Sequence, residues 1–108
     1  MVDKAVASQN ELVNPGATAT LASASNLPSG LWSVKYLIST NVAVEVIVRH
    51  LDPSNTILRF QQKLYLAANT TQVVPLELVL DNNDILHAYV VAAVTGKVCG
   101  GITAIKLG

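Results

Sequence analysis

Hydrophobic and polar residues alternate with a period of two along most of the chain from residue 17 onward. In the segment 30–39, Trp32, Val34, Tyr36 and Ile38 occupy even positions, whereas Ser33 and Lys35 occupy odd ones. Such alternation is typical of β-strands that place one face on a core and the other toward solvent or a partner. The same pattern predicts strands over 17–24, 30–39, 42–51, 56–66 and 71–80.

Two segments near the C-terminus are predicted to be strands of a less regular kind. Segment 84–95 is apolar on both faces in its second half, which indicates a central strand that is buried on both sides. Segment 97–107 contains Gly100-Gly101, and a glycine pair inside a strand indicates a bulge or the close approach of another backbone. Residues 11–13 would add an eighth strand if they pair.

Turn-forming residues separate these strands at short intervals, and the turns are rich in Asn, Asp, Pro and Gly. Many short strands of this kind are typical of sandwiches and barrels, and eight strands in two sheets form a jelly roll. The sequence therefore predicts an all-β, jelly-roll-like antiparallel β-sandwich of seven or eight strands, as a single domain over 15–108. Residues 1–14 are predicted to form an extended N-terminal arm. The favoured interpretation is a segment that is mobile or lies along its own domain, and the alternative is an arm that docks on a neighbouring subunit.

Composition excludes several classes of function. The 108 residues are 51% hydrophobic and 13% charged, with a formal net charge of zero. Disorder driven by charge and a basic nucleic-acid surface are therefore excluded. No apolar run approaches the roughly 20 residues of a membrane helix. We therefore expect no membrane as a partner and, without a basic surface, no nucleic acid. The single cysteine, Cys99, allows no intrachain disulfide and favours folding in a reducing cytosol.

Candidate chemistry is sparse in this sequence. His50 and His87 fall in predicted strands, and His50 continues an inward face, where a hydrogen-bonded histidine at a strand end is expected. No cluster of histidine and cysteine has ligand spacing, so no metal or other cofactor is predicted. Asp81-Asn82-Asn83-Asp84 is the densest group of oxygen ligands; a calcium ion is one interpretation, and a polar hairpin turn is the favoured one. Without paired carboxylates or a nucleophile motif, we expect no catalytic residues and no enzyme.

Apolar residues at outward positions of the predicted strands favour association with another chain. Several such residues on adjacent strands form a patch of the kind found at interfaces. Zero net charge with a mean hydropathy of +0.44 also favours self-association. The alternative is that a second sheet covers these positions, so that they belong to the core. Ala43 is also outward but is not included in the predicted interface. The interface combines the apolar residues of the N-terminal segment with the outward apolar residues of the strands, and comprises Val2, Val6, Leu12, Val13, Leu37, Ile47, Val73 and Val79.

Several stretches of the chain resemble one family of proteins. They are Gly-Leu-Trp-Ser-Val-Lys-Tyr-Leu-Ile at 30–38, Val-Ile-Val-Arg-His-Leu-Asp at 46–52, the aromatic-containing strand 57–60, the stretch 69–72, and the small-residue strand that ends at 102–107. In pattern and strand order these stretches are similar to the small jelly-roll proteins that decorate the heads of tailed bacteriophages, the capsid decoration or cement proteins. The similarity covers roughly residues 21–107.

This resemblance implies a non-enzymatic virion protein that forms homotrimers on the outer capsid surface and stabilises contacts between subunits of the major capsid protein. It also implies assembly in the host cytoplasm. The alternative is a carbohydrate-binding β-sandwich module of a phage fibre or a bacterial surface lectin, which predicts an exposed aromatic side chain with convergent polar groups. Tyr65 is the aromatic residue that points outward by alternation. A subunit of a tail or baseplate ring is a third interpretation.

Overall fold

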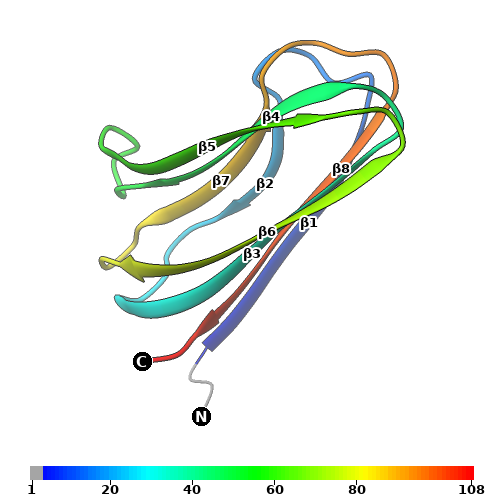
Figure 1. Ribbon diagram of the computed structural model, residues 1–108. Coiled ribbons are helices and arrows are strands. Elements are labelled where there is room, and N and C mark those ends of the chain that lie inside the picture. The colour runs from blue at the N-terminus through cyan, green and yellow to red at the C-terminus, as the bar shows by residue number, and fades with distance from the viewer. Residues whose placement is uncertain (1–3) are drawn as a thin grey trace.

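The chain folds into eight antiparallel β-strands arranged as two four-stranded sheets (Figure 1). The computed structural model describes the backbone of residues 4–108 and the side chains of residues 8–108, and within that range it contains no helix. The strands are β1 (Lys4–Val13), β2 (Thr20–Ala24), β3 (Gly30–Thr40), β4 (Val44–Leu51), β5 (Leu58–Leu66), β6 (Thr70–Leu80), β7 (Ile85–Val90) and β8 (Lys97–Lys106).

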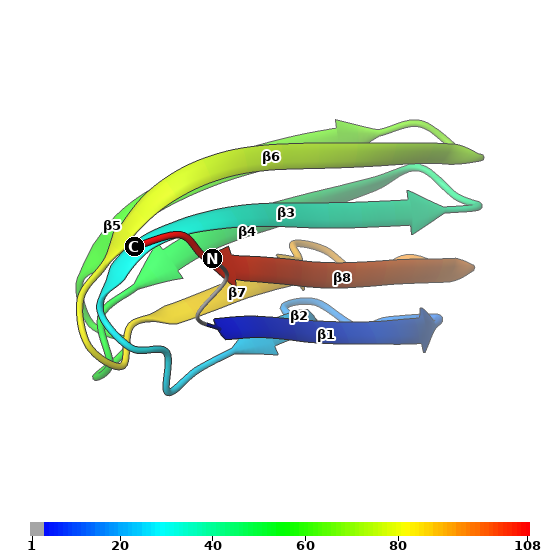
Figure 2. The same cartoon turned by 90° about the horizontal axis from the view of Figure 1, so that it is seen from below.

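The order of the strands is that of a jelly roll. Sheet A has the order β1-β8-β3-β6 and sheet B has the order β2-β7-β4-β5, with every pair antiparallel. Consecutive strands alternate between the sheets, except that β4 and β5 form a hairpin inside sheet B. Figure 2 shows sheet A in front, with β6, β3, β8 and β1 side by side, and sheet B behind it. The predicted jelly-roll-like sandwich is therefore confirmed.

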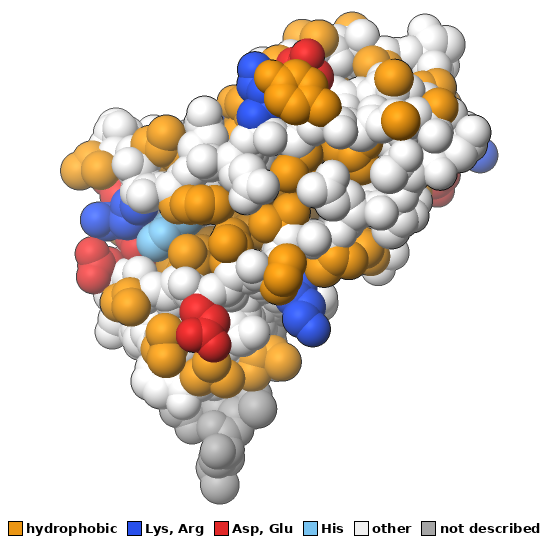
Figure 3. All heavy atoms as spheres, viewed as in Figure 1, with side chains coloured by type: hydrophobic (Ala, Val, Ile, Leu, Met, Phe, Trp, Pro, Cys, Tyr) orange, Lys and Arg blue, Asp and Glu red, His pale blue; other side chains and the backbone are white. Residues whose placement is uncertain are grey.

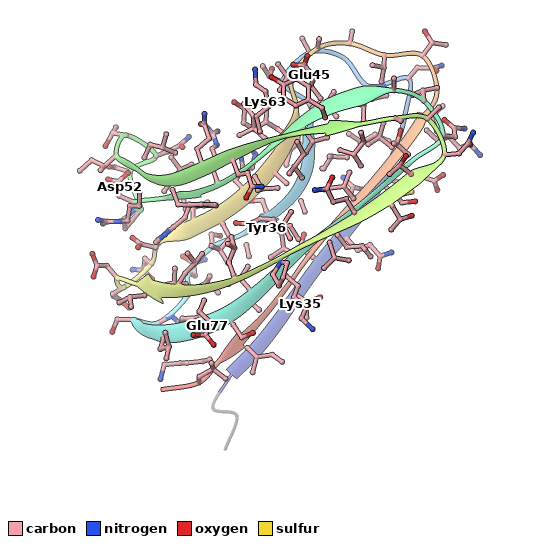
Figure 4. The ribbon with its side chains drawn as sticks, viewed as in Figure 1. Lys35, Tyr36, Glu45, Asp52, Lys63 and Glu77 are labelled. Atoms are coloured by element: carbon pink, nitrogen blue, oxygen red, sulfur yellow. The ribbon has the colours of Figure 1, made fainter. Side chains whose placement is uncertain are left out.

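Side chains from both sheets fill the space between them, because alternation places every second residue of a strand inside. The polar atoms of two large core residues find partners there. Trp32 Nε1 donates to the carbonyl of Pro28 at 3.1 Å, and the Tyr36 hydroxyl donates to the carbonyl of Arg49 at 3.0 Å. The second bond joins β3 of sheet A to β4 of sheet B (Figure 4), and burial raises the pKa of Tyr36 well above its usual range. The largest fully buried side chains are Trp32, Tyr36, Leu21, Leu27, Ile38, Leu80, Leu86 and Ile102.

The alternation locates all the strands from β2 to β8, with differences at their ends. The largest difference is in the predicted strand 84–95, which is shortened to β7. The apolar residues that follow β7 form a loop, in which Val94 still packs against the core. Ala92 and Ala93 are exposed and Val91 is only partly buried, so the apolar character of this segment marks neither a continuing strand nor a buried core.

The glycine pair Gly100-Gly101 marks a close approach and not a bulge. β8 pairs with β1 and β3 in unbroken register, and the register shifts lie in the β2–β7 and β4–β5 pairs instead, where β2 and β5 each carry one extra residue. Gly100 is buried, and a Cβ atom at this position would lie 2.6 Å from the Cβ of Leu21. Leu21 belongs to the opposing sheet, so the missing side chain lets β2 pack directly onto β8.

Residues 4–13, predicted to belong to an arm, form an edge strand of sheet A. β1 pairs with β8 along its whole length, from Lys4 opposite Lys106 to Val13 opposite Lys97. This pairing satisfies backbone N–H and C=O groups that an extended arm would leave to water. The observed arrangement is therefore the interpretation in which the segment lies along its own domain. Residues 1–3, which include the predicted interface residue Val2, lie outside the described residues.

The edge of the sandwich formed by β5 and β6 is less tightly closed than the alternation predicts. Alternation with the buried Leu64 and Leu66 would place Leu58 inward, but it is exposed, and Phe60, Leu76 and Leu78 are only partly buried. Both strands are the last in their sheets, so no neighbouring strand covers this side. Figure 3 views the molecule from this edge and shows hydrophobic side chains along it.

Candidate functional site

The outer face of sheet A carries three of the predicted interface residues. Leu37 of β3 lies directly opposite Val73 of β6, and Leu31 lies opposite Val79. All four side chains are exposed, and Val79 is the most exposed at 73%. Opposed residues of an antiparallel pair point to the same face, so these are two apolar pairs on one surface. Leu31 was not predicted, although the alternation that places Trp32 inside also places Leu31 outside.

Polar residues separate these two apolar pairs. Ser33 opposite Glu77 and Lys35 opposite Pro75 lie between them in the register of β3 and β6. Figure 4 shows Lys35 and Glu77 on the outer side of this sheet. The predicted patch is therefore divided into two apolar pairs with one basic and one acidic side chain between them. Such a mixture is typical of interfaces between proteins that also exist apart.

Ile47, another predicted interface residue, is covered by its own chain. It lies on the outer face of sheet B as predicted, yet it is only 6% exposed. Lys63 is opposite it on one side and Tyr89 on the other, and the stems of long side chains cover apolar neighbours. The prediction that Ile47 is available to a partner is therefore wrong.

The remaining predicted interface residues lie in or near β1. Leu12 packs against the core of its own domain, which corrects its assignment to an interface, whereas Val13 is exposed. Val6 lies opposite Ala104 in the register of β1 and β8, and its side chain is outside the described part of the chain. Ala43 is exposed and lines the pocket considered below.

A cluster of aromatic and polar side chains lies at the centre of the outer face of sheet B. Arg49 Nε donates to Nδ1 of His87 at 3.0 Å, so Nε2 of this ring carries the proton and faces Thr20 Oγ1 at 3.1 Å. The rings of His87 and Tyr89 stack with centroids 5.5 Å apart, and the guanidinium carbon of Arg49 lies 4.7 Å from the Tyr89 centroid. These side chains partner one another, and we assign the cluster a structural role.

Burial, and in second place the positive charge of Arg49, lower the pKa of His87 from its ordinary value of 6.5. Protons therefore bind His87 more readily in the unfolded chain than in the folded one. We expect His87 to contribute stability above about pH 6.5 and to lose that contribution as the pH falls toward its folded-state pKa. Urea unfolding at about pH 7.5 and about pH 5.5 measures this. The His87→Gln variant should lose less stability between these two pH values, and an equal loss in both proteins would contradict the assignment.

The turn between β6 and β7 holds a buried acid, Asp84. Its Oδ2 accepts hydrogen bonds from His50 Nε2 at 2.7 Å and from the backbone N–H of Asp81 at 2.9 Å, and Arg59 Nε lies 3.1 Å from the same oxygen in an ion pair. Arg59 also reaches the carboxylate of Asp81 at 3.2 Å. Segment 81–84 is thus a polar turn, and His50 is a buried, hydrogen-bonded histidine as predicted. The network fastens the turn to β4 and β5.

A second aspartate, Asp52, organises the loop between β4 and β5 (Figure 4). Its Oδ1 accepts the backbone N–H groups of Thr56 and Ile57, both at 2.8 Å, and the Ser54 hydroxyl donates to the same carboxylate. These bonds, that of Ser54 first, hold the pKa of Asp52 well below its usual range. The carboxylate therefore stays ionised and engaged within the loop.

A pocket of about 450 Å³ opens at the other end of the β4–β5 hairpin. Tyr65, 70% exposed, and Glu45 contribute to its wall. Lys63 Nζ lies 5.8 Å from the Tyr65 ring centroid and 3.7 Å from Glu45 Oε2, and Figure 4 shows Lys63 and Glu45 near each other on the outer side of sheet B. The rest of the wall is apolar and consists of Ala43, Val44, Leu66, Ala67, Ala92 and Val94.

Other reactive groups are few in the part of the chain that the structure describes. There, no three His, Cys, Asp or Glu side chains are grouped so that they could hold a metal ion. Over the same residues, no helix has the length and apolar character needed to cross a membrane. Cys99 is a free, partly exposed thiol opposite Ser39 on the outer face of sheet A.

Comparison with known proteins gives structural neighbours. No family model matches the chain, and no curated protein matches its sequence. The globular domain of zebrafish complement 1qA protein matches with a TM-score of 0.64 at 7% identity, over 96% of this chain and 97% of that chain. A chain in the acidic stable capsid structure of Helicobacter pylori bacteriophage KHP30 matches with a TM-score of 0.62 at 15% identity, over 99% of this chain and 90% of that chain. The jelly-roll fold is shared.

A third neighbour comes from a carbohydrate-active enzyme. The CBM22-1–GH10 modules of Clostridium thermocellum xylanase 10B, complexed with xylohexaose, match with a TM-score of 0.61 at 12% identity, over 91% of this chain and 21% of that chain. The chain thus spans about a fifth of the xylanase polypeptide but nearly all of the capsid chain. Identities this low show a common fold and leave function to the surfaces of this chain.

Proposed function

We propose that the protein is a non-enzymatic structural component of a bacteriophage virion that binds the outer surface of the capsid as a homotrimer and stabilises contacts between major capsid protein subunits. The observation that carries the proposal is the match to the phage capsid chain over 99% of this chain and 90% of that one. Coverage this complete in both directions means that the two chains are of nearly equal size. The neighbour is therefore a chain of a capsid structure that has about the length of this fold.

The surface of sheet A supports association between copies. The pairs Leu37–Val73 and Leu31–Val79 are exposed on one face, with Lys35 and Glu77 between them. Apolar pairs favour burial, and the two charges between them favour one register of docking over others. A rigid trimer would then present three copies of a capsid-binding surface. Three weak contacts on one rigid body bind far more tightly than one, because the second and third contacts form intramolecularly once the first has bound.

The hydrogen bonds of the titratable residues support a role without catalysis. The two histidines are each engaged within the protein, His50 by Asp84 and His87 by Arg49. Asp84 is enclosed by three donors, and Asp52 is held by its own loop. His50, Asp84 and Asp52 stabilise turns and strand ends, and His87 stabilises the outer face of sheet B. General acid–base catalysis, in contrast, needs a group that faces a substrate.

The trimer is tested by the solution mass of the purified protein, measured by light scattering. We expect the mass of three chains for the wild type. The Val79→Asp and Leu37→Asp variants should raise the dissociation constant of the trimer by at least ~10-fold, because each places a carboxylate in an apolar contact. The control is Gln61→Asp, which adds the same charge at an exposed position of sheet B. A monomeric wild type, or variants that trimerise like the control, would overturn the trimer.

The capsid role is tested by co-sedimentation with empty shells of the major capsid protein encoded in the same genome. Wild-type protein should bind the shells in a saturable manner. The Val79→Asp variant should be retained roughly 10²-fold less well, because it binds through one contact and not three. Absence of wild-type binding would overturn the capsid role, and equal retention of both proteins would overturn the multivalent mechanism.

A further inference from the structure

The pocket at the end of the β4–β5 hairpin has the composition of a small-molecule site. Such sites have volumes of roughly 300–1,000 Å³ and largely apolar walls with a few polar groups that set orientation. This pocket has a volume of about 450 Å³, and six of its eight lining residues are Ala, Val or Leu. Its polar groups are the carboxylate of Glu45 and the hydroxyl of Tyr65. The virion role proposed above uses neither residue.

Tyr65 offers a flat aromatic surface beside this pocket. It stands on the outer face of β5, an edge strand of sheet B, and its side chain is 70% exposed. An exposed ring next to a concave apolar wall is costly to leave in water and gains free energy when a flat partner covers it. The partner that fits has an apolar face of the size of one ring and polar groups around its rim.

Lys63 and Glu45 supply hydrogen-bonding groups at the edge of this surface. Their charged atoms lie 3.7 Å apart, and both side chains are partly exposed. The ammonium donates and the carboxylate accepts, so adjacent hydroxyl groups of one ligand can be bound by both. The pair neutralises itself, which disfavours a strongly charged ligand such as a phosphate. The matching chemistry is a neutral, polyhydroxylated ring.

We propose that this pocket binds one pyranose unit of a glycan, stacked on Tyr65 through the C–H face of the sugar ring and hydrogen-bonded through its hydroxyls to Glu45 and Lys63. The methyl groups of Ala43, Ala67 and Ala92 form the wall next to the ring. The site recognises a sugar whose hydroxyls are equatorial, because axial C–H bonds then give it a flat apolar face. Binding here is independent of trimer formation through sheet A.

The test is a titration of ¹⁵N-labelled protein, followed by amide chemical shifts, with methyl β-D-glucopyranoside, methyl β-D-xylopyranoside and methyl 2-acetamido-2-deoxy-β-D-glucopyranoside. Sorbitol is the matched control ligand, since it carries similar hydroxyls without a ring face. At least one of the sugars, raised to about 20 mM, should shift amides of residues 43–45, 65–67 and 92–94, as expected for a dissociation constant of about 1 mM. Sorbitol should leave them unchanged.

Variants separate stacking from hydrogen bonding. Tyr65→Ala should weaken binding at least ~10-fold, Tyr65→Trp should retain it, and Glu45→Gln should weaken it a few-fold. The exposed Gln61→Ala on the same strand is the control and should bind like the wild type. No response to any of the three sugars, or a response that Tyr65→Ala leaves intact, would overturn the proposal. Shifts of these amides on dilution of the protein, without a sugar response, would make the pocket a subunit contact and would also overturn it.

Discussion

Replacement of Asp84 by alanine is expected to lower the free energy of unfolding by about 3–5 kcal/mol. The side chain of Asp84 is fully buried and binds His50, Arg59 and the backbone N–H of Asp81. Without the carboxylate, a buried imidazole and a buried backbone donor lose their acceptor, and a partly buried guanidinium loses one of its two partners. Urea unfolding at neutral pH measures the effect. A loss of this size would leave little stability in a domain of this length.

Asp81 provides the matched control for this experiment. It lies in the same turn and binds the same arginine, but its side chain is 72% exposed. Exposed ion pairs contribute about 0–1 kcal/mol, so Asp81→Asn should change stability little. Asp84→Asn, which keeps the shape of the side chain and removes its charge, should fall between the two. Equal effects at Asp81 and Asp84 would show that the buried network does not stabilise the turn.

Replacement of Gly100 by alanine is expected to destabilise the domain by about 1–3 kcal/mol. The added Cβ would lie 2.6 Å from the Cβ of Leu21, an atom that no change of rotamer moves. The two sheets would have to separate locally, and close-packed cores resist such movement. Thermal and urea unfolding measure the change.

Gly101 supplies an internal comparison for Gly100. It is adjacent in the same strand, and the nearest atom to a Cβ placed there is 3.4 Å away, which is an ordinary contact. Gly101→Ala should therefore be neutral or slightly stabilising, because alanine restricts the unfolded chain. If both variants lose the same stability, the packing of Leu21 is not the reason that position 100 is glycine.

The period-two pattern predicts the parts of the fold in which burial alone decides the position of a side chain. Trp32, Tyr36 and Ile38 are completely buried in β3 as the alternation requires, while Leu37 between them is exposed. The turns can also be predicted from the sequence, because asparagine tolerates the left-handed backbone conformation that turns require. Asn55 and Asn83 adopt this conformation. A two-sheet β-sandwich follows from these signals without knowledge of the strand order.

The errors occur where distant residues decide the outcome. Ile47 is covered because the pairing of β4 with both β5 and β7 brings Lys63 and Tyr89 beside it, and alternation within β4 carries no such information. β1 was predicted only as a possible strand over 11–13, because Ser8, Gln9 and Asn10 are polar and the pairing of this segment with β8 is not visible in its own pattern. The bond between His50 and Asp84 joins residues 34 positions apart. The sequence predicted that His50 would be hydrogen-bonded, but it did not identify Asp84 as the partner.

Pro75 lies opposite Lys35 in the middle of β6, one of the two edge strands of sheet A. An unprotected edge strand is a template on which further strands can add without limit, as in fibrils. Proline has no N–H to offer an incoming strand, and its ring obstructs the approach. Growth by strand addition at β6 is therefore blocked at its midpoint, while the apolar side chains on either side stay accessible from the face of the sheet. The outer face of sheet A can therefore bind partners in closed complexes of defined size, while open polymers that grow by strand addition at β6 are disfavoured.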